Sequence, residues 1–176
     1  MKKPHLYILC GLPFAGKTTL ARALVQRLGI SRVAIDDING ERGIWNDETG
    51  LSEEEWKNTY NEAYRRIGIH LSRGESVVDD SVNFTKELRD RLRAIAQRYD
   101  AHSAVIYIDI PLTEVQRRWQ ENRQTLERGD VRDDDFAQVV EYFEPPTGDE
   151  QTLRYDGSIP IEEWISMNFL SEAKEA

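Results

Sequence analysis

The stretch GLPFAGKTT at residues 11–19 constrains the fold of this chain more than any other. It follows the apolar run LYIL and precedes leucines spaced four residues apart, so a buried strand should lead through a loop into a helix. Gly11 and Gly16 allow backbone angles that a side chain would forbid, so successive N–H groups can point at one anion. The positive end of the following helix favours the same anion. The stretch is therefore predicted to bind phosphate.

The same residues fit the pattern G-x-x-x-x-G-K-[ST], which a strand-to-helix turn that happens to contain glycines would rarely match by chance. Lys17 supplies a mobile cation for the β- and γ-phosphates of a nucleotide, and the Thr18 hydroxyl can bind Mg²⁺. ATP with Mg²⁺ is the expected cofactor. The residues expected to contact it are Gly11, Leu12, Pro13, Phe14, Ala15, Gly16, Lys17, Thr18 and Thr19.

Short apolar runs alternate with helical patterns along the rest of the chain. Strands are predicted at residues 6–10, 32–35, 76–79, 104–110 and 153–155. Helices are predicted at residues 17–28, 52–72, 86–98, 113–126, 135–143 and 162–170. Residues 38–50 are rich in glycine and are predicted to form a loop, and Ser52 and Glu55 have the spacing of a capping box. This alternation predicts an α/β fold, with helices on both faces of a parallel sheet, in a single domain over residues 1–176.

The composition narrows the possible partners and location. A formal net charge of −9 makes the chain a poor general binder of nucleic-acid backbone. No apolar run approaches the roughly 20 residues that span a bilayer, and the short apolar stretch near the N-terminus is not predicted to be a signal peptide. A single cysteine, Cys10, excludes an internal disulfide and fits a reducing cytosol, so we expect a cytoplasmic protein.

Two aspartates, Asp79 and Asp80, follow the third predicted strand. Ligands of an open parallel sheet bind beyond the carboxyl ends of its strands, and an apolar strand that leads to a carboxylate is typical of a Mg²⁺ site. Successive residues of a strand face opposite ways, so either carboxylate can serve. We favour Asp79 for the metal and Asp80 for the substrate side. The alternative is a pair that only initiates a turn before Ser81.

Another pair, Asp36 and Asp37, follows the second predicted strand. A kinase needs a group that accepts the proton of the substrate hydroxyl in line with the γ-phosphate, and we assign this role to Asp36. Loop capping by either aspartate is the alternative. Asp37 is predicted to contact the substrate, and Arg42 to meet an anionic group on it. Trp45, in the same loop, either stacks on a substrate ring or covers the edge of the core.

Arginines gather within residues 117–135, the segment that we predict to form a lid. Phosphoryl transfer spreads negative charge over three oxygens, and cations that close over it lower the barrier. Arg123 and Arg128 lie beside the charged break RGDVRDDD and are the candidates for this role. Arg117 and Arg118 each have a glutamate four positions away, which is typical of a solvated helix face.

Together these stretches resemble the small P-loop kinases of the AAA_33 type, whose relatives include zeta toxins, chloramphenicol phosphotransferase and the kinase domain of polynucleotide 5′-kinase. The stretches that carry the resemblance are GLPFAGKTT at 11–19, AIDD at 34–37, VVDDSVNFTKELRDRLRAIA at 77–96, RRWQENR at 117–123 and YFEPPTGDE at 142–150. The resemblance implies the three-layer P-loop NTPase fold, with a five-stranded parallel sheet in the order 2-3-1-4-5 and a small helical lid. It also implies Mg-ATP as donor and a hydroxyl acceptor, with Asp36 as base and Arg123 or Arg128 acting from the lid.

The predicted function is therefore an ATP-dependent kinase that phosphorylates a hydroxyl of a small-molecule or nucleotide-type substrate. One alternative is a regulatory protein that binds or hydrolyses ATP and acts through a partner. The chain lacks the N-K-x-D motif typical of guanine-specific switches, which favours the kinase. A second alternative is a toxin-like kinase of a cell-wall precursor.

Overall fold

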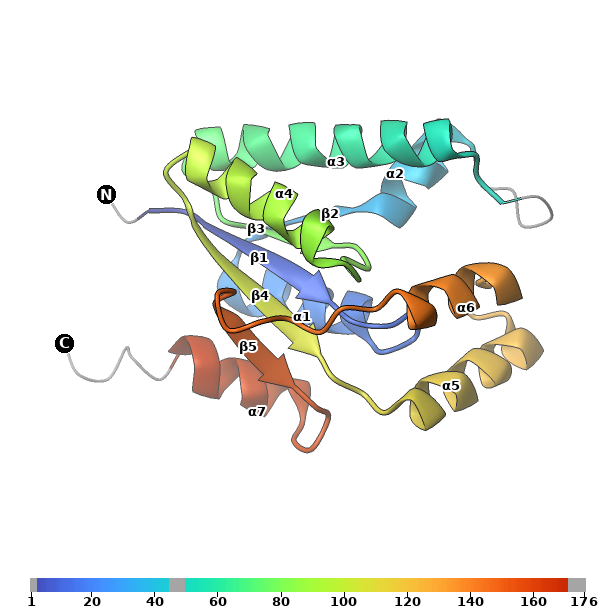
Figure 1. Cartoon of the computed structure of the whole chain (residues 1–176). Coiled ribbons are helices and arrows are strands. Elements are labelled where there is room, and N and C mark those ends of the chain that lie inside the picture. The colour runs from blue at the N-terminus through green and yellow to red at the C-terminus, as the bar shows by residue number, and fades with distance from the viewer. Residues whose placement is uncertain (1–2, 45–49, 171–176) are drawn as a thin grey trace.

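Five parallel strands form one sheet in the computed structural model, which describes residues 3–44 and 50–170 (Figure 1). Their order is β2-β3-β1-β4-β5, as predicted. The strands are β1 (His5–Cys10), β2 (Ser31–Ala34), β3 (Val77–Asp80), β4 (His102–Ile108) and β5 (Thr152–Tyr155). Because every pairing is parallel, the carboxyl ends of all five strands lie at the same edge of the sheet.

Helices cover both faces of this sheet (Figure 1). They are α1 (Lys17–Leu28), α2 (Ile35–Arg42), α3 (Glu53–Ser72), α4 (Lys86–Arg98), α5 (Leu112–Thr125), α6 (Asp133–Glu141) and α7 (Ile161–Ile165), which a π-helix (Ser166–Leu170) follows. Helices α3 and α4 lie on one face, and α1 and α7 lie on the other. Helices α5 and α6 extend past the carboxyl ends of the strands, where they form a small helical lid. None of the helices within the described ranges is long and apolar enough to span a lipid bilayer.

Strand β1 is apolar from Leu6 to Cys10 because side chains on both of its faces pack into a core. Ile8 packs in one core with Ile67 of α3, whereas its neighbour Leu9 packs in the other core with Leu24 of α1. All four side chains are fully buried. The continuous apolar run that precedes the glycine-rich loop is thus explained by a central position between two helical layers.

The ends of the long helices follow the signals in the sequence. Helix α1 ends at Gly29, whose φ of 66° places it in the left-handed region and whose N–H donates to Val25 O. The capping box of α3 is confirmed: Glu55 N donates to Ser52 Oγ at 3.2 Å, and Ser52 N donates to Glu55 Oε2 at 2.7 Å.

The prediction of a loop over residues 38–50 is wrong in its first part. Helix α2 runs from Ile35 to Arg42, with Ile35 and Ile38 buried beneath it. Gly43, with φ of 63°, is the C-cap of this helix, since its N–H donates to the carbonyls of the last turn. The glycines thus mark the end of a short helix. Trp45 lies outside the described residues.

A buried ion pair holds the loop that follows β3. Arg89 of α4 donates to Glu150 through Nε at 2.6 Å and Nη2 at 3.0 Å, and both side chains are fully buried. Arg89 Nη1 also donates to Asn83 O at 3.0 Å, and Glu144 N donates to Phe84 O at 2.8 Å. The stretch YFEPPTGDE therefore fastens the loop after β3, which lines the site described below.

Candidate active site

The loop between β1 and α1 has the backbone geometry of a phosphate-binding loop. Gly16 has φ of 104° and Phe14 has φ of 64°, so both lie in the left-handed region, which a bulky side chain such as Phe14 rarely adopts. Gly11 passes close to β4, since a Cβ on it would lie 2.9 Å from Ile108 O. Lys17 Nζ donates to Gly11 O at 3.0 Å and to Leu12 O at 2.7 Å, so its ammonium lies within the loop.

Gly11→Ala is expected to destabilise the protein by about 1–3 kcal/mol, because its methyl group would overlap a backbone oxygen that cannot turn away. Gly148→Ala is the matched control, because Gly148 is exposed and nothing lies within 4 Å of the added Cβ. Chemical denaturation of both variants measures the difference in the free energy of unfolding. Equal midpoints for the two variants would contradict the close approach of Gly11 to β4.

Burial makes the charge of Lys17 sensitive to what binds beside it. Loss of solvent lowers the pKa of Lys17 to about 8, although the nearby Asp80 carboxylate acts in the opposite direction. An anion held at the loop would favour the charged ammonium and raise this pKa. The position of Lys17 therefore suits a cation that pairs with phosphate.

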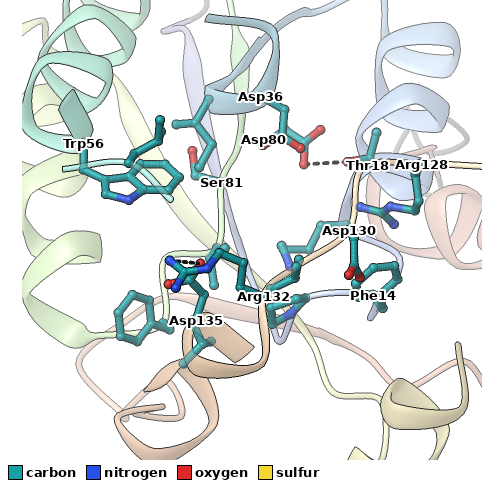
Figure 2. A pocket seen from close by; sticks show the side chains of 18 of the residues that line it. Phe14, Thr18, Asp36, Trp56, Asp80, Ser81, Arg128, Asp130, Arg132 and Asp135 are labelled. Carbon is teal, nitrogen blue, oxygen red and sulfur yellow. Dashed lines mark hydrogen bonds and ion pairs between the residues drawn. The ribbon is translucent and has the colours of Figure 1, made fainter. Parts of the chain in front are cut away.

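A cavity of about 360 Å³ lies between this loop, α3, the loop after β3 and the lid (Figure 2). One end is lined by charged and hydroxyl groups, which are Lys17, Thr18, Asp36, Asp80 and Arg128. Much of the remaining wall is apolar or aromatic, with contributions from Ile35, Leu51, Trp56, Tyr60, Val82, Phe84, Val131 and Val139. Figure 2 shows Trp56 on the opposite side of the cavity from Thr18 and Arg128.

The sequence favoured Asp79 of β3 for the metal and Asp80 for the substrate side, but the structure does not bring Asp79 to Thr18. Asp80 lies in the cavity, where its Oδ1 accepts a hydrogen bond from Thr18 Oγ1 at 3.3 Å. Its Oδ2 accepts from Arg32 Nε at 2.8 Å. Asp79 is buried outside the cavity lining, accepts from Ser81 Oγ at 3.0 Å and Asn83 Nδ2 at 2.6 Å, and has a pKa raised by burial to about 7. Asp80, and not Asp79, is the carboxylate beside Thr18.

Asp36 is accessible from the cavity and lies on the first turn of α2. Partial exclusion of water raises its pKa, and the neighbouring charge of Asp80 raises it further, while Arg128 and Lys17 act against both. Its carboxylate is therefore close enough to the phosphate-binding end to respond to three of the charges there.

Two other predicted substrate contacts lie outside the cavity lining. Asp37 is exposed and accepts from Arg32 Nη1 at 2.7 Å. Arg42 Nη1 donates to Thr59 Oγ1 at 2.7 Å, and thus ties α2 to α3. No local pattern in the sequence indicates this partner of Arg42, which lies seventeen positions away.

The two candidate lid arginines have different surroundings. Arg128 lines the cavity with its guanidinium carbon 4.7 Å from the centre of the Phe14 ring, and no ion pair among the described residues involves it. Arg123 is absent from the cavity lining, lies over the Trp119 ring at 4.2 Å, and pairs with Asp130 at 3.1 Å. The structure brings Arg128 to the site and leaves Arg123 behind it.

Trp119 supports the lid loop, which comprises residues 126–132. Its ring stacks on Phe136 with centroids 4.1 Å apart, and its Nε1 donates to Asp130 Oδ1 and Val131 O, both at 3.0 Å. Asn122 also donates to Arg128 O at 3.0 Å. These contacts fix the loop that carries Arg128 into the cavity.

Sequence reasoning missed a contact of Arg118. Its Nη1 donates to Phe14 O at 3.4 Å and to Ala15 O at 3.3 Å, while its Nε donates to Glu114 at 2.8 Å. The predicted surface pair with Glu114 is therefore present, and the same guanidinium also reaches the phosphate-binding loop. The i,i+4 spacing gave no signal for this second contact, which joins residues 103 or more positions apart.

The chain was compared with family models, with known proteins and with solved structures, and each comparison finds similar proteins. The model of the family AAA_33, an AAA domain, matches residues 6–146. The chain is 30% identical over 151 residues to the adenylyl-sulfate kinase of Picosynechococcus sp., covering 83% of this chain and 81% of that protein. It is 28% identical over 161 residues to the Protein KTI12 homolog of Arabidopsis thaliana, covering 88% of this chain and 51% of that protein.

Among solved structures, Chaetomium thermophilum Kti12 in complex with ADP-AlF3 has a TM-score of 0.75 at 19% identity, covering 92% of this chain and 94% of that chain. This likeness confirms the three-layer α/β fold predicted from the sequence. The chain spans about half the length of the Arabidopsis protein, and 22% of the length of three mycobacterial proteins that it also matches.

Proposed function

Because the chain belongs to the AAA_33 family of AAA domains, we propose that it is an ATP-dependent kinase that phosphorylates a hydroxyl group of a small molecule. One observation carries the proposal: Lys17, Thr18, Asp80, Asp36 and Arg128 line one end of a single cavity. The adenylyl-sulfate kinase among the relatives and the ADP-AlF3 in the Kti12 structure support a phosphotransferase that uses ATP.

The donor would lie on the loop between β1 and α1. The backbone N–H groups of the loop and the N-terminus of α1 favour the phosphates, and Lys17 pairs with their charge. The hydroxyl of Thr18 and Oδ1 of Asp80 are hard oxygen ligands, 3.3 Å apart, which fit Mg²⁺ together with phosphate oxygens and water. When bound, Mg²⁺ would neutralise part of the negative charge on the phosphates. Arg32 holds the other oxygen of Asp80 and so orients this carboxylate.

The acceptor would enter beside Asp36. The hydroxyl oxygen of the acceptor would attack the γ-phosphorus, and the hydroxyl proton would pass to the Asp36 carboxylate. The bond from the γ-phosphorus to the bridging oxygen of ADP would break in the same step. Arg128, which lines the same end of the cavity over the Phe14 ring, would balance the negative charge on the transferred group. Arg123, which is paired behind the lid loop, has no part in this proposal.

Asp80→Asn is expected to weaken the dependence of ATP binding on Mg²⁺, because the amide is a much poorer ligand for this cation than the carboxylate. Calorimetric titration of ATP with and without Mg²⁺ measures the difference. The wild type should bind ATP at least about tenfold more tightly with Mg²⁺, and Asp80→Asn should lose most of that gain. Asp37→Asn is the matched control, since Asp37 also pairs with Arg32 but does not contact Thr18. An unchanged Mg²⁺ effect in Asp80→Asn would exclude this metal position.

The function itself is tested with γ-labelled ATP and a panel of alcohols that includes nucleosides, sugars and amino alcohols. We expect transfer of label to at least one acceptor. If calorimetry shows no binding of Mg-ATP, the proposal fails at its first step. If ATP binds but no acceptor gains label, the alternative of an ATP-binding regulatory protein is favoured.

A further inference from the structure

The part of the cavity remote from the phosphate-binding loop is aromatic. Trp56 and Tyr60 lie one turn apart on α3, with ring centroids 6.2 Å apart, and both line the cavity. Phe84 joins them from the loop after β3, whose position is fixed by the Arg89–Glu150 pair. Flat faces of this kind bind unsaturated rings by stacking, and they give a ringless polyol few hydrogen bonds.

The charges near this aromatic end disfavour an anionic acceptor. The lid contributes Arg132 together with the carboxylate of Asp135, 3.9 Å from it, and Asp36 adds a further negative charge to the cavity lining. Asp130 is not counted, because its carboxylate pairs with Arg123. The cations Lys17 and Arg128 line the phosphate-binding end, where the donor would use them. A phosphate, sulfate or carboxylate on the acceptor would therefore meet more negative than positive groups.

The size of the cavity and its polar edge limit the acceptor further. Its volume of about 360 Å³ lies near the lower end of the range of roughly 300–1,000 Å³ that is typical of small-molecule sites. Helix α6 and its N-cap bring the guanidinium of Arg132, the carboxylate of Asp135 and the amide of Gln138 to the cavity. These groups can both donate and accept hydrogen bonds at the edge of a ring.

On this basis, and resting on the proposed kinase function, we propose that the acceptor is a compact, uncharged alcohol with a flat unsaturated ring that stacks on Trp56. A nucleoside has this chemistry, with a base for the aromatic end and a sugar hydroxyl for Asp36. An aryl alcohol is the second source of the same chemistry. The adenylyl-sulfate kinase relative is named for an acceptor that carries anionic groups, and this chain is expected to differ from it.

The test is a calorimetric titration of acceptor probes into the wild-type protein saturated with Mg²⁺ and a non-hydrolysable ATP analogue, which occupies the donor site. The probes are adenosine, cytidine and benzyl alcohol as uncharged ring compounds, adenosine 5′-monophosphate as the anionic match to adenosine, and gluconate as a ringless acid. At least one uncharged ring compound should bind at least about tenfold more tightly than both anions.

Trp56→Leu should then weaken the binding of the best ring probe by at least about fivefold, because a base stacked on an aromatic side chain contributes that much or more. Trp56→Phe should restore most of the affinity. Tyr64→Leu is the matched control, because Tyr64 continues the same row of rings on α3 but lies outside the cavity lining. The affinity for the ATP analogue should be the same in all of these proteins.

The possible outcomes separate this inference from the function on which it rests. Loss of binding of the ATP analogue itself in the wild type would overturn the kinase proposal. With the analogue bound, tighter binding of gluconate or the monophosphate, no binding of any ring probe, or an unchanged affinity in Trp56→Leu would overturn the acceptor class alone. Preference for the nucleosides over benzyl alcohol would identify the ring as a nucleobase, and the reverse preference would identify it as an aryl group.

Discussion

Replacing Asp36 by asparagine is expected to lower the rate of phosphoryl transfer by about 10²- to 10⁴-fold, the usual contribution of a positioned general base. The amide has nearly the same shape but cannot take up the proton of the acceptor hydroxyl. Because the phosphate-binding loop is left intact, the affinity for Mg-ATP should change little. Single-turnover assays with a saturating acceptor measure the rate, and calorimetry measures the affinity.

The pH dependence of the same reaction gives a second readout. Partial exclusion of water and the charge of Asp80 raise the pKa of Asp36, so its carboxylate is protonated at a higher pH than an ordinary aspartate. The wild-type rate should therefore fall as the pH drops through this raised pKa, and Asp36→Asn should lack that decline. Asp37→Asn, altered at the exposed neighbour outside the cavity lining, should keep both rate and profile. A wild-type rate in Asp36→Asn would rule out this base.

Glu150→Gln is expected to lower the free energy of unfolding by about 3–5 kcal/mol, because it leaves the fully buried guanidinium of Arg89 without an opposite charge. Burial would raise the pKa of Glu150, but hydrogen bonds from Arg89 and from Thr147 N–H outweigh that effect and lower it. The pair therefore contributes fully above the unfolded pKa of about 4.3, and its contribution is lost as the pH falls through the lower folded value. Denaturation at neutral and acidic pH measures both effects.

Asp149→Asn is the control for that experiment. Asp149 is exposed and pairs with Lys86 at 3.1 Å on the surface, where solvent screens the pair and it contributes little to stability. The double variant Arg89→Met/Glu150→Leu should recover most of the lost stability, since it removes both buried charges and retains apolar volume. A loss in Glu150→Gln no larger than that in Asp149→Asn would contradict the structural role of the buried pair.

Local signals in the sequence predicted the regular elements well. Helices α1 and α4 have the predicted bounds, because a left-handed glycine ends the first and the Thr85 side chain caps the start of the second. The apolar runs located every strand. Helix α2 was missed because Gly40 and Gly43 resemble loop residues in the sequence, and only the burial of its isoleucines shows why a helix forms there.

The site was predictable only where the residues are adjacent in sequence. The phosphate-binding loop is continuous, so its pattern was sufficient to identify it. Which aspartate of β3 faces Thr18 depends on Asn83 and Ser81, whose donors hold Asp79 in the interior. The Arg89–Glu150 contact joins positions 61 residues apart, and no local spacing indicates it. Choosing between Arg123 and Arg128 likewise required the contacts that Trp119 makes with the lid loop.

Trp119 lies outside the cavity lining, yet it supports residues that do line the cavity. Its indole anchors the lid loop, residues 126–132, which carries both Arg128 and Arg132 to the cavity lining. Under the proposed function, Arg128 would contact the donor and Arg132 the acceptor, so one loop would support both substrates. Binding of either substrate would then hold this loop in place for the other, and the two affinities would be coupled.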